Sequence, residues 1–172
     1  HAWSFLRKQF KLGLVSGQWE YDLPEDFGGF IDSELSFVQD DEAWEQVRLV
    51  DSLEIHRLRS LSNVETSEFA SYAAVNNIPT DLDRGYRQSL MLWPTPSGTA
   101  TLIGSYVYNP SAIADATPYH LGGQPHGETL IASCLAAAEL LNNDETGNHQ
   151  ARYERLLAGS IAMDRQLTTP KF

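Results

Sequence analysis

The sequence is poor in cysteine and in basic residues. It contains one cysteine, Cys134, so no disulfide can form within the chain and nothing points to an oxidising compartment. Lysine and arginine number 12 against 23 acidic residues, which gives a formal net charge of −11. Proteins that bind nucleic acid do so largely through lysine and arginine contacts to phosphates. The excess of acidic residues therefore argues against DNA binding and against a basic membrane-surface helix.

Long apolar runs and catalytic signatures are also missing. No segment approaches the roughly 20 apolar residues that a membrane-spanning helix needs. The sequence has no G-x-S-x-G, Walker or G-x-G-x-x-G motif, and Cys134 falls on an apolar helical stripe, which predicts a buried and unreactive thiol. We therefore expect no catalytic residues and no cofactor.

One group of residues has the chemistry of metal ligands. His120, His126 and Glu128 supply imidazole and carboxylate groups within a short stretch. No H-E-x-x-H motif accompanies them, and no P-C-x-x-C follows for a deaminase-type site. A polar loop that caps the following helix explains the group more simply, so we expect no metal.

Two further patterns leave other functions open. Glycoside cleavage uses a pair of carboxylates, and Glu25 with Asp26 is one candidate pair. The surrounding segment is so rich in acidic residues that such pairs are expected there without any catalytic role. Trp19 and Trp44 could stack on sugars, although Trp19 alternates with apolar residues and is predicted to lie in the core. A carbohydrate-binding β module and a cell-wall-degrading virion protein remain alternatives.

The negative charge is concentrated in one fifth of the chain. Between Glu20 and Glu54 there are 12 acidic residues and one base, Arg48, so this segment alone accounts for the net charge of −11. The same segment alternates apolar and polar residues, as in Trp19, Tyr21 and Leu23, which is typical of half-buried strands. Charge and β-structure therefore coincide.

Turn signals between alternating segments predict three hairpins and one short helix. A polar tip at 39–42 joins a strand that starts at Phe30 to one at 44–50, and Asp51 or Ser52 can cap a helix near 52–61. The other two hairpins join residues 9–15 to 18–23, through Ser16-Gly17, and 86–93 to 99–108.

After Pro110 the pattern changes to helical spacing. The predicted stripe of the first helix comprises Leu130, Ile131, Cys134, Leu135, Ala138 and Leu141, and that of the second Tyr153, Leu156, Leu157 and Ile161. Packing the two stripes against each other would leave part of their apolar surface exposed, so we expect a further element to cover them. We expect an α+β fold: a β-rich body at 1–110, a connecting loop at 111–125, a helical hairpin at 126–167 and a tail at 168–172, in a single structural unit.

Six short segments occur together in a characteristic order. They are WSFL (3–6), VSGQWEYDLPEDF (15–27), SYAAV (71–75), LMLWPTP (90–96), YVYNP (106–110) and GGQPHGE (122–128). In this order they resemble the head-to-tail adaptor proteins of tailed bacteriophages, also called head-completion or connector proteins, which include tail tubular proteins.

The resemblance implies a structural protein of the virion neck. Such proteins form rings, usually of twelve copies, that bind the portal protein on one side and the tail or the next neck protein on the other. DNA passes through the ring without being bound specifically. Family members normally begin with a helical segment before W-S-F-L. We therefore expect an N-terminal helix, absent from this chain, to cover the C-terminal helices.

Two sets of residues are expected to serve assembly. Asp40, Asp41 and Glu42 lie in the acidic segment, and an acidic channel wall would repel DNA phosphates. By analogy with the family, the C-terminal tail is expected to become ordered on the portal, with its last residue filling a pocket. The tail consists of Gln166, Leu167, Thr168, Thr169, Pro170, Lys171 and Phe172.

Overall fold

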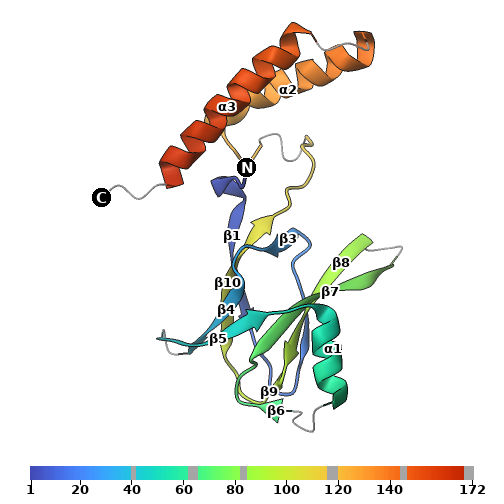
Figure 1. The fold of residues 1–172 in the computed structure, drawn as a ribbon, viewed down its shortest axis with the longest axis vertical. Helices are drawn as coiled ribbons and strands as arrows, with labels where there is room; N and C mark the ends of the chain where they lie inside the picture. Colours follow the sequence, from blue (N-terminus) through green and yellow to red (C-terminus); the bar gives the residue numbers. More distant parts are fainter. Residues whose placement is uncertain (40–41, 62–65, 82–84, 116–119, 144–146, 169–172) are drawn as a thin grey trace. The chain divides into compact units, whose positions relative to one another are not determined.

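The computed structural model describes residues 1–39, 42–61, 66–81, 85–115, 120–143 and 147–168. They form two compact units. The β-rich unit is residues 7–109, and the helical unit combines residues 1–6 with residues from 110 onward. The chain thus starts in the helical unit, builds the whole β-rich unit and then returns (Figure 1). The expected α+β class with a C-terminal helical hairpin is confirmed.

One eight-stranded sheet dominates the β-rich unit. Its order is β1-β10-β4-β5-β7-β8-β2, with β3 also paired to β10, and only the β5–β7 pair is parallel. The strands are β1 Arg7–Gly13, β2 Glu20–Asp22, β3 Phe27–Phe30, β4 Glu34–Gln39, β5 Glu42–Leu49, β7 Tyr72–Asp81, β8 Gly85–Trp93 and β10 Thr101–Tyr108. A separate ribbon pairs β6 (Thr66–Ser67) with β9 (Thr95–Pro96).

Apolar side chains cover both faces of the β7–β8 hairpin. Ala73 and Leu92 are paired in register and belong to the main core, which also contains the fully buried Phe37. The next pair, Ala74 and Met91, belongs to a second cluster, because successive side chains of a strand point to opposite faces.

The helix of the β-rich unit is the one that the sequence predicts. α1 runs from Ser52 to Leu61, and the Leu53 amide donates a hydrogen bond of 2.8 Å to Asp51 Oδ1, so Asp51 is the cap. Ile55 is fully buried in the second cluster, whereas Leu53 and Leu61 are exposed. The apolar stripe of α1 is therefore narrower than its leucine content suggests.

Of the three expected hairpins, one is confirmed. β4 and β5 pair in antiparallel fashion around the predicted tip at 39–42. The other two expectations are wrong: β1 pairs with β10 and β2 with β8, while β8 and β10 have other partners. The turn after Val15 is held by the Tyr21 hydroxyl, which accepts from the Val15 amide and lies within hydrogen-bond distance of the Val15 and Gln18 carbonyls, while the backbone of β2 bonds to β8 and that of β1 to β10.

The helical unit contains the short 3₁₀ helix η1 (Ser4–Leu6) and the antiparallel pair α2 (Gln124–Asn143) and α3 (Asn148–Thr168). Ala132 and Ala136 are buried on the side of α2 that faces α3. Thr129 Oγ1 and Ser160 Oγ lie 2.6 Å apart across this contact. The expected stripe of α3 is half-buried here, whereas the expected stripe of α2 is exposed.

Candidate functional site

The six segments that carry the resemblance contact one another within each unit. In the β-rich unit, SYAAV (71–75) pairs with LMLWPTP (90–96) as part of the β7–β8 hairpin. The Leu92 amide donates a 2.8 Å hydrogen bond to the Trp19 carbonyl, which joins LMLWPTP to the segment 15–27. The segments of the β-rich unit, though scattered along the chain, therefore form one packed framework within that unit.

Asp26 connects three parts of this framework. Its Oδ2 accepts a 2.6 Å hydrogen bond from Lys8 Nζ on β1, and its Oδ1 accepts one of 3.0 Å from the Tyr106 hydroxyl on β10. The Asn109 amide donates to the Asp26 carbonyl at 2.7 Å. Lys8 Nζ also lies 3.6 Å from the centre of the Tyr108 ring, a cation–π contact.

These contacts change the ionisation of all three groups. Partial burial acts to raise the pKa of Asp26, but the hydrogen bonds from Lys8 and Tyr106 outweigh it, so this pKa is lowered. The hydrogen bond to Asp26 raises the pKa of Lys8. Burial, followed by the hydrogen bond to Asp26, raises the pKa of Tyr106. The network is therefore most stable when Asp26 is charged and Tyr106 is neutral.

We expect the stability of the β-rich unit to depend on pH through Asp26. A carboxyl whose pKa is lower in the folded than in the unfolded chain stabilises the fold fully above its unfolded pKa, and this contribution disappears as the pH falls below about 4. Asp26→Asn should flatten that part of the profile. Urea unfolding from about pH 6 to about pH 3 measures it, and equal slopes for both proteins would contradict the assignment.

The helical unit brings WSFL (3–6) against GGQPHGE (122–128). The rings of Trp3 and Phe5 each lie 5.2 Å, centre to centre, from that of the buried His126. Asp164, which is buried on α3, fixes the same segment. It accepts hydrogen bonds from the Ser4 hydroxyl at 2.5 Å and from the Ser4 amide at 3.2 Å, and its Oδ2 lies 2.7 Å from His1 Nε2.

Sequence reasoning missed this anchor. One signal was available: Asp164 follows Leu157 and Ile161 at helical spacing, which places a carboxyl in line with an apolar stripe. A buried carboxylate needs hydrogen-bond donors, and no sequence pattern shows that the donors come from residues at the other end of the chain.

The β4–β5 hairpin carries the first expected set of assembly residues. Asp40 and Asp41 lie outside the described residues, and Glu42 begins β5 opposite Gln39. β10 pairs with β4 only at 36–38, and β7 pairs with β5 only at 48–49. Over residues 42–47, within the described part of the sheet, β5 therefore pairs with β4 alone, and the end of this hairpin, here called the arm, projects from the sheet (Figure 1).

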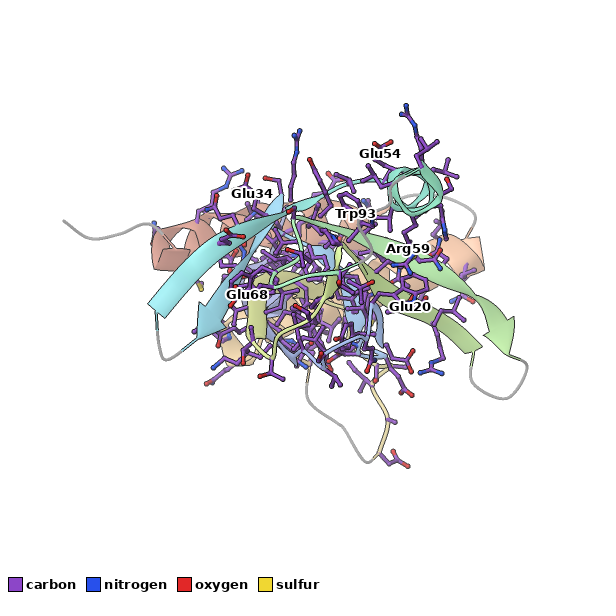
Figure 2. The ribbon with its side chains drawn as sticks, turned by 90° about the horizontal axis from the view of Figure 1, so that it is seen from below. Glu20, Glu34, Glu54, Arg59, Glu68 and Trp93 are labelled. Atoms are coloured by element: carbon purple, nitrogen blue, oxygen red, sulfur yellow. The ribbon has the colours of Figure 1, made fainter. Side chains whose placement is uncertain are left out.

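Other acids of the segment are engaged individually. Asp22 forms an ion pair with Arg87 at 2.5 Å, and Glu20 Oε1 accepts a 2.6 Å hydrogen bond from the Ser89 hydroxyl. Glu34 and Glu54 come from different elements and lie apart in Figure 2. These acids are dispersed, whereas Asp40, Asp41 and Glu42 are three consecutive acidic residues in the sequence.

The second expected set of assembly residues lies at the end of α3. Gln166, Leu167 and Thr168 belong to its last turn, so the helix extends into the segment that the sequence assigned to a tail from position 168. Residues 169–172, including Phe172, lie outside the described residues.

Two of the three residues that have the chemistry of metal ligands, His126 and Glu128, make other contacts. Glu128 Oε2 accepts a 3.2 Å hydrogen bond from Arg152, and His126 packs against the aromatic rings of Trp3 and Phe5. Within the described ranges, no three histidine, cysteine or acidic side chains are grouped as metal ligands would be.

The sequence places Trp19 in the core; in the structure it is half-buried and packs against the second apolar cluster without belonging to its buried residues. The Arg59 guanidinium, labelled in Figure 2, lies 3.9 Å from the centre of the Trp19 ring. One face of the indole is therefore already covered. The side chain of Trp44 lies outside the described residues. The expectation for Cys134 is wrong, because the thiol-bearing residue is exposed on α2.

Comparison with known families agrees with this framework. A sequence model of the SU10 adaptor protein family matches residues 4–170, which includes all but one residue of the six segments. A search of curated proteins found no match to the chain. In the described residues, no helix is long and apolar enough to cross a membrane.

Proposed function

The chain belongs to the SU10 adaptor protein family, and from this premise we propose that it forms a ring in the neck of the virion, between portal and tail. Its role as a phage structural adaptor follows from the family match, which spans both units. The proposal adds that copies, usually twelve in such rings, bind the portal protein on one side and the tail or the next neck protein on the other. DNA would pass through the centre.

The observation that carries this proposal is the match over residues 4–170, together with the contacts among the matched segments. Those contacts are structural: hydrogen bonds such as Tyr106 to Asp26, ring packing such as Trp3 on His126, and strand pairing. Residues that fix a framework suit a protein whose task is to hold a shape within an assembly.

We expect the purified protein to add a ring to portal particles, and the C-terminal segment to be required. Electron microscopy of the mixture should show extra density coaxial with the portal. Deletion of residues 166–172 should abolish binding, because we propose that Phe172 fills a portal pocket. Phe172→Ala should weaken binding, whereas Lys171→Ala should matter less. Undiminished binding by the deleted chain would contradict the role of this segment.

We propose that Asp40, Asp41 and Glu42 face or border the DNA channel. An arm that leaves the sheet can place its tip away from the body of the subunit, and acidic groups there would keep phosphates from adhering. Their charge is effective at short range, because salt screens it beyond about 8–10 Å.

Reversing this charge should make rings hold DNA. With all three residues changed to lysine, we expect duplex DNA to be retained on the order of ten- to a hundredfold more tightly at low salt, and less so as salt rises. Filter binding with assembled rings measures this. The matched control changes Glu25, Asp32 and Glu68, which are exposed elsewhere on the β-rich unit, to lysine. Equal retention by the control would contradict a channel position.

A further inference from the structure

β1 is an edge strand of the sheet, and one of its sides is open. In the described residues it pairs with β10 along its whole length and with no other strand. The Leu14 amide donates to the Ala100 carbonyl at 2.8 Å, at the end of the β1–β10 ladder. Counting back from this bond, the alternation of an antiparallel ladder turns the amides and carbonyls of Gln9 and Lys11 away from β10. Both residues are exposed, so the open side of β1 offers backbone groups to an approaching strand.

The arm carries a second open edge, on β5. The Arg48 amide donates to the Ser71 carbonyl at 3.0 Å, which is where the pairing of β5 with β7 begins. Within the described part of the sheet, nothing continues this pairing over residues 42–47. β5 also contains a β-bulge, one residue more than the facing stretch of β4, and a bulge bends its strand. The arm therefore carries a strand edge away from its own sheet.

The two open edges have opposite charge. β1 holds three basic residues and no acid, whereas residues 39–47 hold four acids and no base. Lys8 is already paired, but Arg7 and Lys11 are exposed and have no ion-pair partner among the described residues. On the arm, Glu45 is exposed as well. Opposite charges on facing strands favour their pairing and like charges oppose it, so an acidic strand suits the edge of β1.

The two edges of one copy cannot meet each other. β10 and β4 lie between β1 and β5, and paired residues form a row across all four strands. In this row Lys11 faces Ile103, Ile103 faces Ser36, and Ser36 faces Gln46. Because neighbouring strands lie about 4.8 Å apart, Lys11 and Gln46 of one copy are about 14 Å apart. The acidic strand that this chain offers to the edge of β1 therefore comes from a second copy.

Other pairings between copies are less favourable. Two β1 edges, or two arms, would place like charges opposite each other. The edge strand at the other end of the sheet, β2, has only three residues. Its two acids are already engaged, Asp22 by Arg87 and Glu20 by Ser89. Short edge strands of this kind are poor templates for a further strand.

We propose that the open edge of β5 in one copy, over residues 43–47, pairs with the open edge of β1 in the next copy and extends its sheet. This inference rests on the proposed ring and names one of the contacts that build it. Because the two edges differ, each copy binds one neighbour through its arm and another through β1. Such a head-to-tail contact closes into a ring when the rotation fits. The tip at 40–42 keeps the channel position proposed above.

Cysteine cross-linking tests this pairing directly. In a Cys134→Ser background, Gln9→Cys and Gln46→Cys place one thiol on each edge at exposed positions and change no charge. A short bis-maleimide reagent, applied to rings assembled on portal particles, should join position 9 of one copy to position 46 of the next. Denaturing gels should then show a ladder of dimers, trimers and larger species. Rings that give no ladder would overturn the pairing and leave the adaptor role intact.

Two controls show whether the cross-link is specific. Gln9→Cys alone and Gln46→Cys alone should stay monomeric on the gel, and dimers of either one would reveal pairing of identical edges and overturn the head-to-tail arrangement. The matched pair combines Gln9→Cys with Ser60→Cys, an exposed position on α1 of the same unit. A ladder as strong from this pair would contradict an arm that lies against β1.

Gln9→Pro tests the backbone contact itself. Proline removes an amide that points away from β10, and edge strands tolerate proline there, so urea unfolding should show a folded β-rich unit. We expect each contact between copies to weaken about tenfold, as for the loss of one buried hydrogen bond. Gln9→Ala keeps the amide and should form rings like the unaltered protein.

Two results of this comparison have different meanings. If folded Gln9→Pro adds rings to portal particles as well as Gln9→Ala does, the edge of β1 is not a contact between copies, and the proposed function stands. Failure of the unaltered protein to add any ring would instead contradict the proposed function, and with it the pairing that rests on it.

Discussion

Phe37→Ala should destabilise the β-rich unit by about 3–5 kcal/mol, the largest effect that we expect from a single substitution. Phe37 is completely buried in the main core, where its ring centre lies 5.2 Å from that of Phe69. Removing the ring loses its transfer free energy and leaves a cavity, because strands on both sides of β4 hold the surrounding atoms in place.

Urea unfolding followed by tryptophan fluorescence measures this loss, since Trp19 and Trp93 lie in the same unit. The matched control is Leu53→Ala, because Leu53 is 76% exposed on α1 and its loss should change the free energy of unfolding by less than about 0.5 kcal/mol. Similar midpoints for the two variants would show that Phe37 is not in a packed core.

Asp164→Ala should destabilise the helical unit by about 2–4 kcal/mol. The buried carboxylate is the acceptor for the Ser4 amide, the Ser4 hydroxyl and His1, so its removal leaves these groups without that acceptor and releases residues 1–6 from α3. Thermal unfolding followed by the helical circular dichroism signal measures the effect.

Two further variants distinguish the contribution of the Asp164 carboxylate to stability from that of its hydrogen-bond donors. Asp164→Asn keeps the volume and one acceptor oxygen and should lose less stability than Asp164→Ala. Ser4→Ala removes one donor and should cost about 1 kcal/mol. If Asp164→Ala unfolds at the same temperature as the unaltered protein, the N-terminal anchor does not contribute to the helical unit.

Local signals in the sequence were sufficient for some elements. Asp51 identified the start of α1, and the polar run at 39–42 identified the β4–β5 turn. Both features depend on residues within a few positions of each other. The alternation at Trp19, Tyr21 and Leu23 likewise revealed a strand, with Tyr21 and Leu23 buried.

Partner choice between strands could not be obtained in this way. Ser16-Gly17 is a turn, and Gly17 adopts a φ of 82°, but the strands that flank it pair elsewhere. Their partners are residues some 70 to 100 positions away, such as Met91 for Glu20 and Tyr106 for Lys8. Nothing in the local sequence encodes that choice.

The candidate surfaces show the same division. Helical spacing grouped the apolar residues of α2 on one side, but spacing alone does not say which side of a helix is buried. In the structure the small residues Ala132 and Ala136 face α3 and the large ones face outward, which is why Cys134 is exposed. The Asp164 anchor escaped detection for a related reason, since its partners lie about 160 positions away.

The interrupted helical unit has a consequence for biosynthesis. Its first six residues leave the ribosome before the sheet, and its helices only after Asn109 has been made. The β-rich unit can therefore fold while translation continues. Ser4 and His1 have no Asp164 to bind until the last helix emerges. The contact between residues 1–6 and α3 can therefore form only after the whole β-rich unit has been synthesised.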